Sequence, residues 1–259
     1  MKNLYRYSCG EGKLDFVMLH GWGMNSNAWR YIINRFGSHF RLHLFDLPGY
    51  GFSQSEESFT LPEISETVLK KAPPQAIWLG WSMGGFIASE IALRYPERVL
   101  ALITVCSSPC FVSQHQWPGI SWQVLSCFEQ KLEDHLQNTL EQFLLLQTLG
   151  TLNSQRDTTS LKSFLFSRPL PKKEVLKAGL KILRYTDMRD SLNAISMPFL
   201  RIYGKLDALV PCKIAELLDE AWPHTESVIM HQSAHVPFIS HPDDFLEVIL
   251  YFYQKYFSH

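Results

Sequence analysis

A single serine lies among glycines in the stretch AIWLGWSMGGFIASEIAL, residues 76–93. The apolar run before it predicts a buried strand and the pattern after it an amphipathic helix, but neither element explains Gly80, Gly84 and Gly85 around Ser82. A strand that turns sharply into a helix strains the turn residue and leaves no room for nearby Cβ atoms, a crowding that glycine relieves. Chance also produces five-residue matches, but this setting predicts a nucleophile elbow that exposes the Ser82 hydroxyl.

A serine hydroxyl is a weak nucleophile until a base takes its proton and a third group orients that base. Enzymes with such an elbow carry serine, acid and histidine in that chain order, with the later two in loops after strands. Asp207 follows the apolar run FLRIYG, and His235 follows SVIM. Both are therefore the predicted partners of Ser82. The competing acids fall in predicted helices or helix-flanking turns; they are Asp187, Asp190, Asp219, Asp243 and Asp244.

The region around His235 holds four histidines, which raises a metal site as an alternative. His224, His231, His235 and His241 are spaced by 7, 4 and 6 residues. This spacing lacks the H-E-x-x-H signature and brings no well-placed carboxylate, so we expect no metal and no organic cofactor. His231 is predicted at a strand end and His241 in a loop or cap.

Acyl transfer also requires hydrogen-bond donors for the negative oxygen of the tetrahedral intermediate. The backbone N–H of Met83, directly after the nucleophile, is one predicted donor. The stretch LHGWGMNSNAW after an early strand supplies the second, for which we choose the Trp22 amide. Taken alone, this loop could equally be an ordinary glycine turn.

Alternating strand-like and helix-like segments predict an α/β fold with a mostly parallel central sheet. The predicted strands lie in 14–21, 40–49, 76–81, 101–109, 197–211 and 226–242, and helices are expected in 57–73 and 243–257. Between residues 111 and 184 the pattern is helical throughout. We therefore expect a core domain made of 1–110 and 185–259, with 111–184 inserted as a helical lid.

The composition limits the partners and the compartment. The 259 residues are 46% hydrophobic, with 24 basic and 25 acidic residues and a net charge of -1, which favours neither nucleic acid nor an anionic membrane. Five cysteines without a C-x-x-C pair indicate no disulfide framework. The N-terminal stretch lacks the pattern of a signal peptide. We expect a cytoplasmic protein that is a monomer.

With these motifs in place, the chain resembles the α/β-hydrolase superfamily, through LHGWG, FDLPGYGFSQS, GWSMGG, GKLDALVP and AHVPFISHP in that order. More narrowly, AIWLGWSMGG, SSPCF with WPGI, FLLLQTLGT and MPFLRIYGKLDALVP look like the carboxylesterases of biotin synthesis. That resemblance implies hydrolysis of the methyl ester of a pimeloyl chain on acyl carrier protein, with release of methanol. It maps catalytic roles onto Ser82, Asp207 and His235, and substrate contacts onto Trp22 and Phe143.

The sequence itself adds to the picture of the substrate. Trp81, Met83 and the catalytic side chains would join Trp22 and Phe143 around the substrate, where each buried methylene contributes about 0.8 kcal/mol. Alternatively, the run FLLLQTLG from Phe143 is core of the lid. The turn DLPGYG around Asp46 is expected to support the active-site face.

Eight basic residues against two acidic ones between Arg156 and Arg184 suggest a surface that attracts an acidic carrier protein. The docking candidates are Arg156, Lys162 and Arg168, while a solvated helical face is the alternative. The resemblance implies docking arginines on the lid helices. This sequence departs from that pattern, with Asn138, Gln142 and Thr159.

Other functions remain open at this point. The same residues would suit a general carboxylesterase or thioesterase for short acyl chains. They would also suit a cofactor-free haloperoxidase or a C–C bond hydrolase of the same fold. A binding module that keeps the fold without catalysis is an alternative of a different class.

Overall fold

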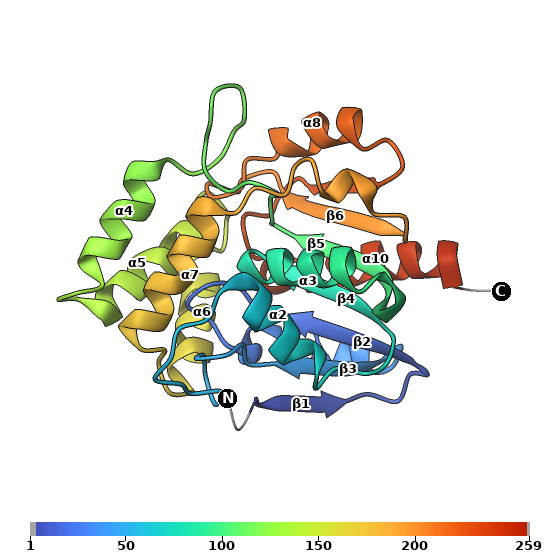
Figure 1. Ribbon diagram of the computed structural model, residues 1–259, viewed down its shortest axis with the longest axis horizontal. Helices are drawn as coiled ribbons and strands as arrows, with labels where there is room; N and C mark the ends of the chain where they lie inside the picture. The colour runs from blue at the N-terminus through green and yellow to red at the C-terminus, as the bar shows by residue number, and fades with distance from the viewer. Residues whose placement is uncertain (1–3, 258–259) are drawn as a thin grey trace.

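The computed structural model describes residues 4–257 and places seven strands in one sheet, in the order β1-β3-β2-β4-β5-β6-β7 (Figure 1). All neighbouring strands run parallel except β1, which pairs antiparallel with β3. The strands are β1 (Arg6–Cys9), β2 (Leu14–Leu19), β3 (Phe40–Phe45), β4 (Ala76–Trp81), β5 (Val99–Val105), β6 (Phe199–Gly204) and β7 (Glu226–Met230). The predicted α/β fold is confirmed; the outer limits of the predicted core, residues 1–3 and 258–259, lie outside the described residues.

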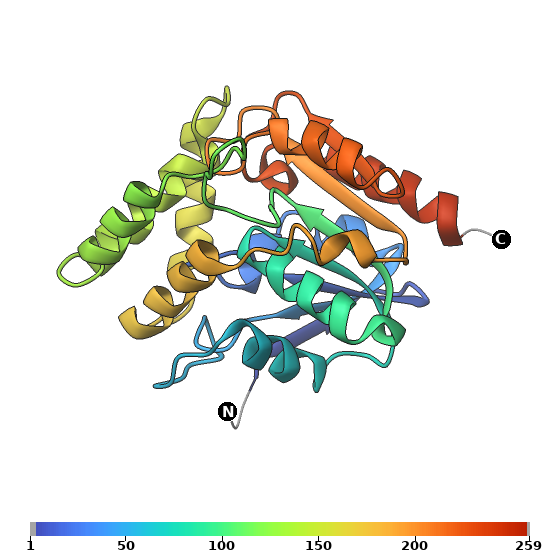
Figure 2. The same ribbon diagram turned by 45° about the horizontal axis from the view of Figure 1, so that its top comes forward.

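Helices cover both faces of this sheet. In Figures 1 and 2, α2 and α3 lie on one face and α10 on the other. Strand β4 is therefore buried along its whole length, as its unbroken apolar sequence predicts. The helices of the core are α1 (Ile33–Gly37), α2 (Leu61–Leu69), α3 (Met83–Arg94), α8 (Lys213–Ala221), α9 (Pro237–Ser240) and α10 (Pro242–Phe257), with short 3₁₀ turns at Ser26–Trp29, Pro96–Arg98 and Leu192–Ala194.

Four further helices are inserted between β5 and β6. They are α4 (Trp122–Lys131), α5 (Leu136–Thr148), α6 (Ser154–Phe166) and α7 (Lys173–Tyr185). The chain leaves and re-enters the core at one place, because Met188 N donates to Pro109 O at 2.8 Å and Cys110 bridges to Asp187. In Figure 1 the arrowheads of β2 and β6 point toward these helices. The inserted segment thus covers the edge of the sheet where the predicted site residues lie.

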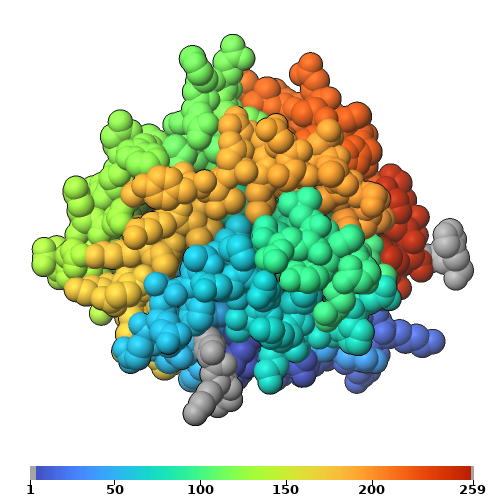
Figure 3. All heavy atoms as spheres, in the orientation of Figure 1, coloured from blue at the N-terminus to red at the C-terminus, as the bar shows by residue number. Residues whose placement is uncertain are grey.

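The inserted segment is packed tightly against the core. Val175 on α7 lies so close to Gly49 that a Cβ on Gly49 would be 2.6 Å from its Cγ1. The space-filling view shows the segment around α7, in yellow and orange, seated against the neighbouring blue-green part of the core (Figure 3). Among residues 4–257, no helix is long and apolar enough to cross a membrane.

Candidate active site

Ser82 occupies a strained turn between β4 and α3. Its φ of 55° lies in the left-handed region, which a serine adopts only when the surrounding structure enforces it. A Cβ on Gly80 would lie 2.2 Å from Gly84 O, and one on Gly84 would lie 2.4 Å from Leu19 O. The predicted reason for these two glycines, close backbone approach around the turn, is therefore correct.

Two hydrogen bonds from the end of β5 hold this turn. Ser82 N donates to Val105 O at 2.9 Å, and Ser107 Oγ donates to Ser82 O at 2.9 Å. Both contacts fix the peptide groups on either side of the strained residue. The Ser107 contact was not foreseen from the sequence, which placed Ser107 within the strand-like run 101–109.

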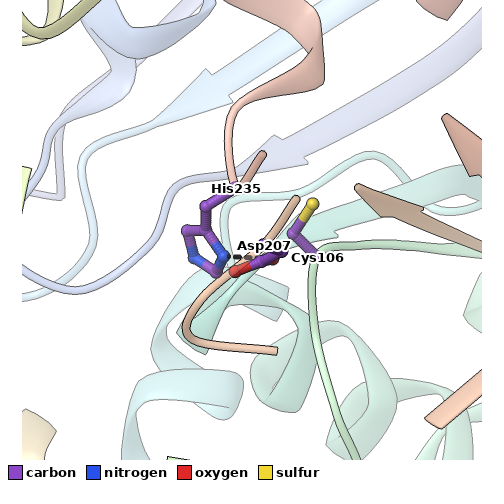
Figure 4. A group of neighbouring side chains, drawn as sticks. All are labelled: Cys106, Asp207 and His235. Atoms are coloured by element: carbon purple, nitrogen blue, oxygen red, sulfur yellow. Dashed lines mark hydrogen bonds and ion pairs between the residues drawn. The ribbon is translucent and has the colours of Figure 1, made fainter. Parts of the chain in front are cut away.

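Asp207 and His235 lie together at the carboxyl ends of β6 and β7. His235 Nδ1 is 2.7 Å from Asp207 Oδ2, and both side chains are fully buried (Figure 4). The other carboxylate oxygen, Oδ1, accepts the backbone N–H groups of Leu209 at 2.8 Å and Val210 at 3.0 Å. These three bonds fix the carboxylate and leave His235 Nε2 as the free end of the pair.

The remaining contact, between Ser82 and His235, is not made here. Within residues 4–257, His235 Nε2 has no hydrogen-bond partner. Hydrogen bonds between catalytic groups are often long in substrate-free structures and shorten only when substrate binds. Proton transfer from Ser82 to His235 therefore stays a prediction.

Trp81 supports His235 from the core. Its Nε1 donates to His235 O at 2.9 Å, and its ring packs against Trp29 and Phe238. The side chain is fully buried in this aromatic group. The structure uses the polar atom of Trp81 to hold the loop that carries His235, and the predicted contact of Trp81 with the substrate stays a prediction.

The loop His20–Gly23 lies directly beside the nucleophile, as predicted. A Cβ on Gly21 would be 3.0 Å from Ser82 Cβ and 3.5 Å from Ser82 Oγ. His20 holds this loop, because its Nδ1 bonds Gly21 O at 2.8 Å and its Nε2 accepts from Leu47 N at 3.0 Å. Burial lowers the pKa of His20 to about 4, so the ring is neutral and Nδ1 carries the proton that Gly21 O accepts.

The two predicted oxyanion donors are available at this place. Met83 is the first residue of α3, where backbone N–H groups have no partner within the helix. In the described part of the chain, neither Met83 N nor Trp22 N donates to a protein acceptor. The arrangement suits stabilisation of a negative oxygen, and the role of both amides stays a prediction.

The predicted substrate contacts Trp22 and Phe143 touch each other. Their ring centroids are 4.7 Å apart in an edge-to-face arrangement, and Trp22 Nε1 donates to Leu176 O on α7 at 2.8 Å. Trp22 is fully buried, Phe143 is 3% exposed and Ser82 is also 3% exposed. The two rings thus form one buried aromatic pair, and their contact with a substrate stays a prediction.

The predicted docking residues differ in their surroundings. Arg156 is exposed and contacts Asp157, and Lys162 bonds Glu141 at 2.8 Å. Arg168 is different, because its side chain is only 8% exposed and is fixed by Asp46. We therefore correct the expectation for Arg168, which binds the core and is not free to contact a partner.

Most of the basic residues between Arg156 and Arg184 are likewise paired. Besides the three just described, Lys173 and Lys177 bond Glu133, Arg184 bonds Glu129, and Lys172 bonds Glu56. Neutral pairs produce a weaker long-range field than the sequence count suggests. This internal pairing favours the alternative of a solvated helical face for much of this segment.

The four histidines of the metal alternative do not gather. Within residues 4–257, the only group of three side chains placed to hold a metal is Cys106, Asp207 and His235. Metal ligands must be deprotonated, but burial raises the pKa of the Cys106 thiol well above its usual value, and His235 Nδ1 already faces Asp207. The donor set therefore fits a hydrogen-bonded cluster better than a metal centre.

Comparison with known proteins agrees with this fold. Residues 16–242 match the family described as the alpha/beta hydrolase fold. Over all 259 residues the chain is 98% identical to the pimeloyl-[acyl-carrier protein] methyl ester esterase of Hamiltonella defensa subsp. Acyrthosiphon pisum (strain 5AT), with 100% of both chains covered. It is 54% identical to the esterase of the same name from Yersinia pseudotuberculosis serotype IB (strain PB1/+), over 98% of this chain and 99% of that one.

Solved structures show the same fold at low sequence identity. An esterase from Exiguobacterium antarcticum matches with a TM-score of 0.83 at 22% identity, over 96% of this chain and 94% of that chain. A bromoperoxidase from Bacillus anthracis matches with a TM-score of 0.87 at 20% identity, over 97% and 95%. At such identities the likeness concerns the fold alone.

Proposed function

Because this chain belongs to the α/β-hydrolase family and, within it, to the pimeloyl-[acyl-carrier protein] methyl ester esterases, we propose that it hydrolyses the methyl ester of pimeloyl-[acyl-carrier protein]. The products are pimeloyl-[acyl-carrier protein] and methanol, and the reaction serves biotin synthesis. The observation that carries the residue roles is the 2.7 Å bond between Asp207 and His235 beside the strained Ser82.

The chemistry proceeds in two steps. Ser82 Oγ attacks the ester carbonyl while His235 Nε2 takes its proton, and Asp207 stabilises the resulting imidazolium. The amides of Trp22 and Met83 bind the negative oxygen. His235 then gives its proton to the leaving methoxide, and methanol departs. Water activated by His235 hydrolyses the acyl-enzyme and regenerates Ser82.

The helical segment acts as a lid over this centre. Since Ser82 is 3% exposed and the Trp22 and Phe143 rings are in contact, a substrate reaches the serine only after α5 moves away from Trp22. The separated rings then pack on the methylene chain. Each methylene that they bury contributes about 0.8 kcal/mol. The closed state keeps water from the site between turnovers.

The acidic carrier protein binds the outer face of the lid in the cytoplasm. Arg156 and Lys162 are the contacts, and Arg168 is excluded because Asp46 holds it. Charges at the rim of an interface chiefly change the association rate and its salt dependence. These two charges therefore contribute less to activity than the catalytic residues do.

The proposal is tested with Ser82→Ala. This variant should fail to cleave p-nitrophenyl butyrate and methyl pimeloyl-carrier protein, and a fluorophosphonate should label the wild-type protein but not the variant. Rescue of a biotin-requiring strain that lacks its own esterase by the wild-type gene, but not by the variant, tests the substrate. Retained activity in Ser82→Ala would refute the mechanism. Good esterase activity without rescue would instead indicate a general short-chain carboxylesterase.

A further inference from the structure

Cys106 is a buried thiol at the centre of the site, and the mechanism does not use it. It follows β5 directly, between the strand that leads to Ser82 and the strand that leads to Asp207. Its φ of 45° lies in the left-handed region, and its N–H donates to Ile202 O on β6 at 2.8 Å. A non-glycine residue keeps such a backbone only where neighbouring contacts enforce it.

The thiol is directed at the loop that carries the histidine. Cys106 Sγ donates to Ala234 O at 3.5 Å, one residue before His235. Sγ, a carboxylate oxygen of Asp207 and a ring nitrogen of His235 all lie within 4.8 Å of one another. Figure 4 shows the Asp207 carboxylate between the imidazole and the Cys106 side chain, with the sulfur pointing away from the carboxylate.

In this environment the Cys106 thiol is unreactive. Burial, and then the neighbouring Asp207 carboxylate, raise the pKa of the Cys106 thiol well above its ordinary value of 9.0. The thiolate is the nucleophilic form, so a thiol kept protonated is neither a nucleophile nor readily modified. What remains is a neutral group of weak hydrogen-bonding capacity.

That weakness matters because each Asp207 oxygen already has its partners. Oδ1 accepts two backbone amides, and Oδ2 accepts His235 Nδ1. A second donor on Oδ2 would share its negative charge and so weaken its hold on the imidazolium. The flank of the carboxylate is therefore best covered by a side chain that does not compete.

We propose that Cys106 is a positioning residue: as a weak donor turned to Ala234 O, it fills the place beside the Asp207 carboxylate without competing with His235 for that carboxylate. The inference rests on the proposed catalytic roles of Asp207 and His235. Cys106 touches neither substrate nor reacting atoms and acts only through Asp207.

Two substitutions separate this role from simple packing. In Cys106→Ser the shorter C–O bond withdraws the hydroxyl from Ala234 O, and the stronger donor turns to Asp207. Cys106→Ala removes the sulfur without adding a donor. We expect Cys106→Ser to lower kcat/KM about tenfold and to move the acidic limb of its pH profile down by about one unit, since one pKa unit corresponds to a tenfold change in equilibrium. Cys106→Ala should stay within about threefold of wild type and keep the wild-type profile.

The experiment measures kcat and KM for p-nitrophenyl butyrate between pH 5 and 9, at a temperature where circular dichroism shows each variant folded. Cys127→Ser, at an exposed thiol on α4, is the matched control and should behave as wild type. Proton NMR gives a second readout, because the low-field signal of the His235 Nδ1 proton should move upfield in Cys106→Ser and stay in place in Cys106→Ala.

A different order of the variants would overturn the proposal. If both variants keep the wild-type pH profile and NMR signal and lose only thermal stability, Cys106 is a packing residue. If Cys106→Ala is the more impaired variant in kcat, the sulfur itself is required, and the absence of a competing donor is not what matters. A wild-type protein that neither cleaves the ester nor reacts with a fluorophosphonate would contradict the proposed function instead, so the two failures are distinguishable.

Discussion

Two buried aspartates follow parallel strands at the same edge of the sheet, and their surroundings differ in one respect. Asp46 comes directly after β3, and Asp207 lies in the loop after β6. Each carboxylate accepts two backbone amides: Asp46 those of Ser26 and Phe52, and Asp207 those of Leu209 and Val210. The third partner separates them, because Asp46 binds the guanidinium of Arg168 and Asp207 binds the imidazole of His235.

The partner decides whether the carboxylate serves structure or chemistry. Arg168 Nη1 lies 2.6 Å from Asp46 Oδ1 and 2.7 Å from Oδ2, and its guanidinium packs against the rings of Tyr5 and Phe52. Arginine stays charged at any physiological pH, so this pair is a permanent link between the helical segment and the core. Histidine gains and loses a proton near neutral pH, so the same carboxylate beside it can stabilise a transient charge.

The largest expected effect comes from neutralising the aspartate with the titratable partner. Asp207→Asn keeps the shape but removes the charge that orients and stabilises the imidazolium, so kcat should fall by about 10⁴-fold. Steady-state kinetics on p-nitrophenyl butyrate measure this. Asp46→Asn is the matched control and should lose stability before it loses catalysis. Equal losses of kcat in the two folded variants would show that the two carboxylates do not differ in their role.

The next effect concerns the permanent pair. Arg168→Met leaves the Asp46 carboxylate buried without its cation, and breaking one side of a buried ion pair costs about 3–5 kcal/mol. Urea denaturation should show this loss in the free energy of unfolding. The double variant Arg168→Met with Asp46→Asn should regain part of it, because no uncompensated charge remains. A loss in Arg168→Met below about 1 kcal/mol, the value typical of surface pairs, would show that the link is unimportant.

A smaller effect concerns His20 and the dependence of stability on pH. Burial lowers the pKa of His20, which lies close to Asp46 and Arg168, from 6.5 to about 4. Above pH 6.5 this ring is neutral in both states. Between pH 6.5 and 4 only the unfolded chain takes up the proton, so the free energy of unfolding should decline by about 3 kcal/mol as the pH falls. His20→Gln should lose this component of the slope, and an unchanged slope in the variant would contradict the assignment.

The sequence predicted the pair of Asp207 and His235 better than the pair of Asp46 and Arg168. The spacing of Gly80, Ser82 and Gly84 predicts a strained, crowded turn from local sequence alone. Residues that follow the predicted strands must also meet at one edge of a parallel sheet. Arg168 was misjudged because its partner Asp46 lies 122 residues away, and no local pattern reveals such a pairing. The short edge strand β1 was missed for a similar reason, since four mostly exposed residues carry little hydrophobic pattern.

The contact between Trp22 and helix α7 could also not be predicted from the sequence. Gly179 lies within the amphipathic helix α7, where a glycine suggests only a weak helix position. In the structure a Cβ there would lie 2.5 Å from Trp22 Cδ1 and 2.7 Å from the Tyr50 hydroxyl oxygen. Close helix packing, which depends on residues more than a hundred positions apart, explains this glycine.

Gly179→Ala therefore tests how closely the lid must fit the core. Overpacking against Trp22 should cost about 1–3 kcal/mol of unfolding free energy. The higher helix propensity of alanine would by itself stabilise α7 by about 1 kcal/mol. The sign of the change in thermal unfolding midpoint decides between the two effects. A more stable variant would mean that α7 is free to shift away from Trp22 at no cost.

The smallest effect is expected on the outer face, where Arg156 is exposed and Lys162 is half-buried, in contrast to the buried side chain of Arg168. Arg156→Glu and Lys162→Glu should each lower kcat/KM for methyl pimeloyl-carrier protein by about two- to fivefold at low salt, because exposed pairs contribute roughly 0.2–1 kcal/mol. The difference should vanish at high salt. Activity on p-nitrophenyl butyrate should not change, since that ester needs no docking. Lys213→Glu on α8 reverses an exposed charge outside the inserted helices and is the control. An equal decrease in that control would show that overall charge, and not this face of the lid, attracts the carrier.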